Sequence, residues 1–169
     1  MSGIRRIIVG TSGSPGSLPA LRSARSLAQR DGALLMAVHA WVPPGGEFAY
    51  RGRPVHLRKL WADAARKRLH EALDLAWGGI PAGLAVEPLV VCGEPGPALV
   101  SLASSADDLL VVGAGRRSRL ARMLRGQVSR YCLARAHCPV IAVPPSALSR
   151  RLARQLRAWN GDLIVEQPI

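Results

Sequence analysis

The length and composition of the chain favour one folded domain with a substantial core. It has 169 residues, 49% hydrophobic and 20% charged, which excludes the class of intrinsically disordered proteins. No apolar run approaches the roughly 20 residues of a membrane-spanning helix, and the first residues enter a strand pattern directly instead of forming a signal peptide. The odd number and wide spacing of the three cysteines do not fit a disulfide framework or a zinc site. We therefore expect a cytoplasmic protein without a membrane span, whose cysteines serve as buried small residues.

The net charge of +12 is concentrated in the last third of the chain. Between Asp108 and Asp162 there are eleven arginines and no acidic residue. Such a surface attracts polyanions, including nucleotide phosphates, nucleic acid and anionic lipid. An alternative interpretation is the codon composition of a GC-rich genome, because only Lys59 and Lys67 among the 23 basic residues are lysines.

The first half of the chain alternates strand and helix patterns. The apolar run Ile4–Gly10 predicts a strand, turn-forming residues occupy 11–17, and apolar residues at helical spacing follow from Leu18 to Ala28. After the helix stop at Asp31 and Gly32, the run Ala33–Ala40 predicts a second buried strand.

A second strand and helix series follows a loop rich in proline and glycine at 41–54. A long helix is expected from Leu57 to Ala76, ended by two glycines. Pro88 favours an edge position for the third strand, because proline cannot donate to a ladder. The remaining expected elements are strand Leu84–Val91, helix Pro95–Ala106 with Pro97 in its first turn, strand Leu109–Val112, helix Gly126–Ala136 and strand Pro139–Val143.

This alternation predicts an α/β fold, an open five-stranded parallel sheet with helices on both faces. With strand order 3-2-1-4-5, ligands bind beyond the carboxyl ends of strands one and four, where the order reverses. The glycine-bearing loops at 11–16 and 113–126 leave these two strands. The helix from Gly126 would direct its free N–H groups and positive dipole end at the same crevice, as in many phosphate sites. A dinucleotide fingerprint at 113–118 lacks its third glycine and is disfavoured.

Five sequence segments carry a family resemblance. They are Ile7–Pro15, Val38–Pro44, Gly93–Pro95, Asp108–Gly113 and Ala136–Val143. In this order and spacing the chain resembles the universal stress protein family over about residues 3–144. The resemblance implies a flavodoxin-like fold in a domain at 1–145. It also implies a homodimer through the fifth strand, Pro139 to Val143, in a family that has ATP-binding and non-binding members.

The ATP-binding members of that family carry Gly, two residues, Gly, nine residues, then Gly and Ser or Thr. This chain has the first and last of these glycines, Gly113 and Gly126, at the same separation. The departures are Arg116 at the second glycine, Gln127 at the Ser/Thr position and Ser12 where an aspartate is usual.

The departures leave two alternatives for the anion site. The Cβ of Arg116 disfavours the left-handed backbone that a glycine permits, which weakens a backbone phosphate cradle. Its guanidinium can instead bind phosphate in a bidentate manner, while Gly115 supplies the flexible position. Either guanidinium groups replace the cradle, or the cradle is lost and only the positive field remains.

Ten positions in or beside these loops are the candidate cofactor-binding residues. They are Gly10, Ser12, Ala40, Val112, Gly113, Gly115, Arg116, Gly126, Gln127 and Val128. The expected cofactor is ATP or another adenine nucleotide, an anionic small molecule. We assign no catalytic residue. We assign no metal ligand either, since the histidines share no ligand spacing. We interpret His39 as a core histidine.

Residues 146–169 form a separate expected unit, a basic amphipathic helix and tail. Its apolar stripe consists of Leu148, Leu152, Leu156 and Trp159, with four arginines around it. The helix either docks on its own domain or a dimer mate, or contacts an anionic membrane surface or nucleic acid without base specificity.

The resemblance to universal stress proteins, together with the basic C-terminal region, leaves three alternative functions. The first is a regulatory ligand-binding module of the stress response. The second is a dimeric interaction protein that binds no nucleotide and uses its basic C-terminal region, and the third is a weak ATPase.

Overall fold

The computed structural model describes residues 3–13, 16–46, 52–114 and 126–146. Its elements in chain order are β1 Arg6–Gly10, α1 Leu18–Asp31, β2 Leu34–Trp41, α3 Val55–Trp77, β3 Val86–Cys92, α4 Pro95–Leu102, β4 Asp108–Gly113, α5 Gly126–Arg135 and β5 Val140–Val143. Every predicted element within the described part of the chain is present, with bounds that differ by a few residues.

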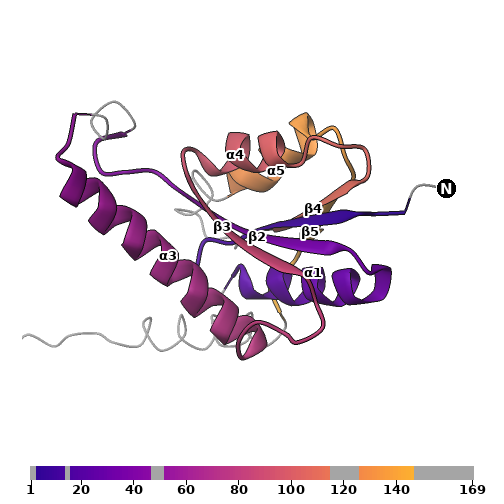
Figure 1. The fold of residues 1–169 in the computed structure, drawn as a ribbon. Helices are drawn as coiled ribbons and strands as arrows, with labels where there is room; N and C mark the ends of the chain where they lie inside the picture. The colour runs from indigo at the N-terminus through magenta and orange to yellow at the C-terminus, as the bar shows by residue number, and fades with distance from the viewer. Residues whose placement is uncertain (1–2, 14–15, 47–51, 115–125, 147–169) are drawn as a thin grey trace, which may run out of the picture.

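The strands form one parallel sheet in the order β3-β2-β1-β4-β5. Helices α1 and α3 cover one face, and α4 and α5 cover the other (Figure 1). The predicted architecture, strand order and edge position of the third strand are therefore confirmed.

Alternate residues of each central strand enter two different cores. Ile7 and Val9 of β1 pack with α1 and α3, whereas Ile8 packs with α4 and α5, and all three are fully buried. A strand covered on both faces must be apolar throughout. This explains why the strands are continuous hydrophobic runs in the sequence.

Glycine ends the two longest helices, as predicted. Gly32 follows α1 with φ 63°, and Gly78 follows α3 with φ 74°. Both have the left-handed conformation that glycine adopts without a Cβ penalty, and their N–H groups donate to the helix carbonyls of Ala28 and Asp74.

The predicted end of the helix that begins at Pro95 is wrong by one turn, because α4 ends at Leu102 and not at Ala106. A compact turn replaces its last residues. The N–H of Ser105 donates to Oδ2 of Asp108 at 2.9 Å, and the N–H of Asp108 donates back to the carbonyl of Ser105 at 3.1 Å. These local bonds compete with further helical bonds and lead the chain into β4.

The amino ends of β1 and β4 are joined by a bidentate ion pair. Nε and Nη2 of Arg6 each lie 2.7 Å from one carboxylate oxygen of Asp108, whose side chain is 1% exposed. Burial by itself raises the pKa of Asp108, but hydrogen bonds from Arg6 and from the N–H of Ser105 outweigh it and lower the pKa below its ordinary value. The carboxylate is therefore charged and paired near neutral pH.

The expected helix at Ala147–Trp159 lies outside the described residues, so the proposed division of the chain after residue 145 stays a prediction. Within the described part, none of the helices has the length and apolar character that crossing a membrane requires.

Candidate functional site

The loop that follows β1 packs against Gly113, the last residue of β4, at the carboxyl edge of the sheet. The two strands pair in parallel from Arg6 beside Asp108 to Val9 beside Val111. A Cβ placed on Gly113 would lie 3.2 Å from the carbonyl oxygen of Gly16 and 3.8 Å from Cα of Ser17. A Cβ at this distance is tighter than an ordinary packing contact, so glycine suits the close approach, and the first predicted ligand loop meets the first residue of the second.

Hydroxyl groups organise the loop after β1. The N–H of Thr11 donates to the carbonyl of Val38 at 2.8 Å, which continues the β1–β2 pairing by one residue. Oγ1 of Thr11 accepts from the N–H of Gly13 at 3.2 Å and lies 3.1 Å from Oγ of Ser17. The Thr11 side chain thus connects the two described ends of this loop.

Gly10, the last residue of β1, faces helix α4. A Cβ at this position would lie 2.7 Å from Cδ1 of Leu99, which is 2% exposed. Because Leu99 already occupies the space above the strand end, glycine is the residue that lets α4 pack here. This role is in packing, beside any role in binding.

The other described candidates lie at the same edge of the sheet in different environments. Ala40 is half-buried near the carboxyl end of β2, and Ser12 is exposed in the first loop. Val112 is 2% exposed and belongs to the core beneath α4 and α5, so its side chain is not at the surface. Val128 is half-buried on α5 and packs against the same core.

The remaining candidates are only partly covered by the structure. Gly126 and Gln127 form the first turn of α5, so the predicted helix start is confirmed. Gly115 and Arg116 lie outside the described residues.

Helix α5 is placed by a close crossing with α4. A Cβ on Gly96 would lie 2.9 Å from Cδ1 of Tyr131, so the two helices approach through a glycine. Arg135 lies above the same tyrosine ring, with its guanidinium carbon 5.7 Å from the ring centroid. The contact of Gly96 with Tyr131 thus joins α4 to α5, whereas the contact of Arg135 with Tyr131 lies within α5.

Thr11 and Ser17 organise the first loop but were not among the predicted site residues. Both are 6% exposed, which is unusual for side chains in a turn segment. The available signal was a hydroxyl residue at each end of the glycine- and serine-rich segment 11–17. Such residues commonly bond to nearby backbone in turns.

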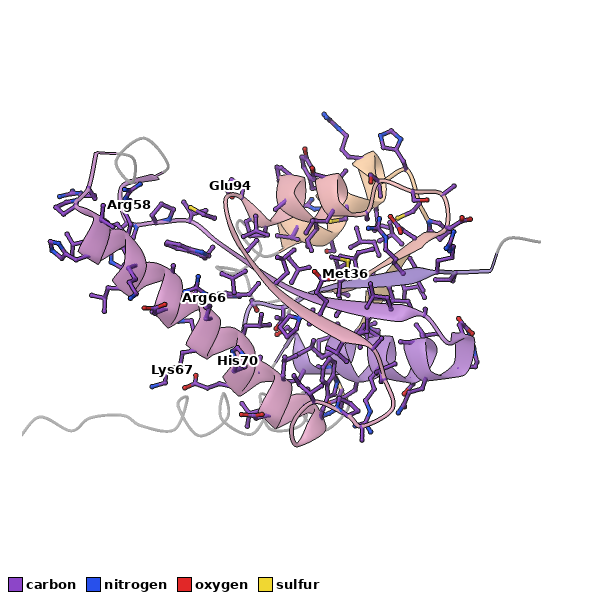
Figure 2. The ribbon with its side chains drawn as sticks, in the orientation of Figure 1. Met36, Arg58, Arg66, Lys67, His70 and Glu94 are labelled. Carbon is purple, nitrogen blue, oxygen red and sulfur yellow. The ribbon has the colours of Figure 1, made fainter. Side chains whose placement is uncertain are left out.

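A groove of about 340 Å³ lies elsewhere, between α3 and the edge strand β3. Its walls include Trp41, Leu69, Arg66 and His70, and Figure 2 labels the last two on α3. None of the ten candidate residues lines it. The groove and the predicted site are therefore different places.

The chemistry available in the first loop is hydrogen bonding and not acid–base catalysis. Residues 11–17 contain hydroxyls, glycines and one proline, and no ionisable side chain. In the described part of the chain, no group of three or more histidine, cysteine or acidic side chains is arranged to hold a metal ion.

The three cysteines all lie in the described part and form no disulfide. Burial raises the pKa of Cys132 to about 11, so this thiol stays protonated near neutral pH. The prediction that the cysteines are buried small residues is confirmed for Cys132, whereas Cys92 and Cys138 are half-buried.

Comparisons with known proteins agree with this fold. The model of the universal stress protein family matches residues 3–144. A universal stress protein of Mycobacterium tuberculosis is 36% identical over 137 residues, which cover 80% of this chain and 42% of the relative. The chain therefore spans less than half the length of that relative.

Two solved structures also resemble the chain. A universal stress protein in complex with cAMP is 29% identical, with TM-score 0.56 over 86% of this chain and all of that one. The protein from Archaeoglobus fulgidus in complex with dAMP is 22% identical, with TM-score 0.54 over 85% of this chain and 99% of that one, and supports the fold alone. With the family model covering most of its length, the chain belongs to the universal stress protein family.

Proposed function

We propose that the chain is a regulatory module of the stress response that binds an adenine nucleotide at the carboxyl ends of β1 and β4. The observation that carries the proposal is the backbone contact between Gly113 and Gly16 at the place where strand order reverses. The similarity to a universal stress protein in complex with cAMP, at 29% identity, supports the adenine class of ligand.

In this proposal the ligand lies across both loops. The phosphate end is assigned to Gly113, Gly115, Arg116 and the first turn of α5, where backbone N–H groups and a guanidinium attract anions. The nucleoside end is assigned to Gly10, Ser12 and Ala40. Because the first loop has no acid or base, binding is favoured over hydrolysis.

Mass spectrometry of the gently purified protein, followed by calorimetric titration with ATP, AMP and cAMP, tests the proposal. We expect a co-purified nucleotide or a saturable heat with at least one of the three. No heat at millimolar concentrations of all three would contradict the nucleotide function.

The variant Gly113→Ala locates the site. Its Cβ would lie 3.2 Å from the carbonyl of Gly16, so the first loop must shift slightly and we expect affinity to fall by about tenfold, or 1.4 kcal/mol. Gly52→Ala is the matched control, because nothing lies within 4 Å of its Cβ position. Equal affinities of the two variants would place the ligand elsewhere.

The proposal includes a homodimer through β5, which is an edge of the sheet with Ile141 38% exposed. An exposed apolar edge strand is suited to pairing with a second copy. We expect Ile141→Lys to yield monomers in light scattering, while Leu133→Lys on α5, which is 57% exposed, leaves the dimer intact. A dimer in both variants would contradict this interface.

Residues 146–169 are proposed as a separate basic unit, and the protein as cytoplasmic, in keeping with cysteines that form no disulfide. Truncation after Pro145 should leave nucleotide affinity unchanged and weaken salt-dependent retention on heparin. Loss of folding on truncation would show that the unit belongs to the domain. Cell fractionation checks the compartment.

A further inference from the structure

A histidine lies beneath the loop that follows β1. His39 belongs to β2 and is 5% exposed, and the neighbouring polar side chains of Thr11 and Ser17 are each 6% exposed. Polar groups this deeply buried lower stability unless they form hydrogen bonds. The bonds that they form therefore indicate what they do.

Nδ1 of His39 lies 2.9 Å from the carbonyl oxygen of Thr11. A carbonyl oxygen can only accept, so Nδ1 carries the proton and donates. Thr11 is the residue directly after β1, where the chain leaves the sheet. The imidazole thus holds the first peptide of the loop in place from the neighbouring strand.

The side chain of Thr11 in turn bonds to the rest of the loop. Its Oγ1 accepts from the N–H of Gly13 at 3.2 Å and lies 3.1 Å from Oγ of Ser17. Ser17 and Gly16 in turn pack against Gly113 of β4, with the carbonyl of Gly16 3.2 Å from the Cβ position of Gly113. A continuous series of contacts therefore connects His39 with Gly113 at the carboxyl end of β4.

The other ring nitrogen shows that packing alone does not explain the histidine. Nε2 of His39 is buried and has no hydrogen-bond partner among the described residues. An unpartnered buried acceptor is destabilising, and an aliphatic side chain in this place would avoid it. The expectation of a core histidine is therefore right about burial, while only one of the two nitrogens is satisfied.

We propose that His39 is a positioning residue of the nucleotide site, whose Nδ1–H holds the Thr11 carbonyl and so keeps the first loop in contact with Gly113. The inference rests on the proposed nucleotide function and deepens it. His39 has no assigned contact with the ligand. It acts through Thr11.

Two substitutions distinguish the effect of the Nδ1–H donor of His39 from the effect of the volume of its imidazole ring. In His39→Asn, the amide nitrogen is attached to Cγ, as Nδ1 is, and can donate to the Thr11 carbonyl. In His39→Leu, the side chain is apolar and has no donor. Calorimetric titration of both variants and of the wild-type protein, with whichever of ATP, AMP and cAMP the wild type binds best, gives the comparison.

We expect His39→Leu to bind the nucleotide about tenfold more weakly, and His39→Asn to remain within about threefold of the wild type. Met36→Ala is the control for general loss of stability. Met36, which is labelled in Figure 2, lies on the same strand and is 7% exposed. It packs into the core on the opposite face of the sheet. The control should unfold at a lower temperature and keep the wild-type affinity.

A ligand-independent measurement completes the test. Long-range ¹H–¹⁵N NMR spectra of the imidazole should show the proton of neutral His39 on Nδ1. A proton on Nε2 alone would overturn the inference whatever the affinities are.

The failures can be told apart. If the wild-type protein binds none of the nucleotides, the proposed function fails and the role of His39 toward a nucleotide fails with it. If the wild type binds and His39→Leu binds equally well, only the inference is overturned. Equal weakening in the leucine and asparagine variants would also overturn it, because ring packing and not the Nδ1–H would then be responsible.

Discussion

The two ends of β1 and β4 are built differently although they belong to the same pair of strands. At the amino ends, Arg6 and Asp108 form two charged hydrogen bonds of 2.7 Å around a carboxylate that is 1% exposed. At the carboxyl ends, Gly10 and Gly113 leave space for Leu99 and for the backbone of the first loop.

The difference separates stability from ligand binding. A buried ion pair between adjacent strands sets their register and is costly to break. In the first loop, glycines and neutral hydroxyls hold backbone groups close together without a fixed charge, so a bound anion meets no acidic side chain of this loop. We therefore expect substitutions at the amino ends to change mainly stability, and substitutions at the carboxyl ends to change mainly affinity.

The largest expected effect is the loss of stability in Arg6→Met. The change leaves the carboxylate of Asp108 buried without its partner, which should lower the free energy of unfolding by about 2–3 kcal/mol, a value reduced by the 36% exposure of the arginine. Urea unfolding measures it. The control Arg30→Met removes the exposed pair with Asp31 and should hardly move the midpoint. Similar midpoints in both variants would contradict a special role for the amino-end pair.

The same ion pair predicts a pH dependence of stability. The pKa of Asp108 is lowered in the folded protein, so the pair stabilises fully above the ordinary carboxyl pKa near 4 and loses this contribution as pH falls through the lower folded value. Urea unfolding of the wild type and Asp108→Asn should therefore show a stability difference that narrows below about pH 4. A difference that stays constant down to pH 2 would show that the carboxylate charge is unimportant.

A smaller effect is expected where α4 crosses α5. The Cβ in Gly96→Ala would lie 2.9 Å from Cδ1 of Tyr131, and the resulting overpacking should lower the free energy of unfolding by about 1 kcal/mol. In a Tyr131→Ala background only the Cβ of residue 131, at 3.2 Å, remains in contact, so the same change should cost less, which a double-mutant cycle by urea unfolding measures. An unchanged effect in that background would mean that Tyr131 is not the obstacle.

The smallest expected effect is a gain of affinity in Ser12→Asp. The resemblance to ATP-binding universal stress proteins places an aspartate at this position, where a carboxylate can accept from a ribose hydroxyl or adenine amine. We expect calorimetry to show an affinity higher by about threefold, or 0.7 kcal/mol. The charge-matched control Ser101→Asp, at an exposed position on α4, should leave affinity unchanged. Weaker binding in Ser12→Asp alone would instead indicate phosphate near this loop.

The parts of the fold with strong local signals were predicted from the sequence. Gly32 and Gly78 were identified as helix stops because no other residue adopts a left-handed cap as easily. The bound of α4 was missed because Ser105 forms its turn with Asp108, whose place is set by Arg6 more than 100 residues earlier in the chain. Helix propensity depends on the residues within a segment, so it cannot account for a partner as distant in the chain as Arg6.

The candidate site was likewise predictable only where its signals are local in the sequence. The sequence located both loops, since glycines after buried parallel strands are visible in a linear pattern. It did not show that Val112 has its side chain in a core, or that His39 bonds to Thr11, because these depend on which face of the sheet a residue occupies and on which strands are neighbours.

By itself the sequence determined the alternation of strands and helices, the glycine stops and the positions of the two loops, because each depends on interactions between near neighbours. Only the tertiary structure decided that Gly113 accommodates the backbone of Gly16, that Arg6 pairs with Asp108 and that His39 holds Thr11. These contacts join residues far apart in the chain, and parallel pairing of β1 with β2 and β4 brings them within hydrogen-bonding or packing distance.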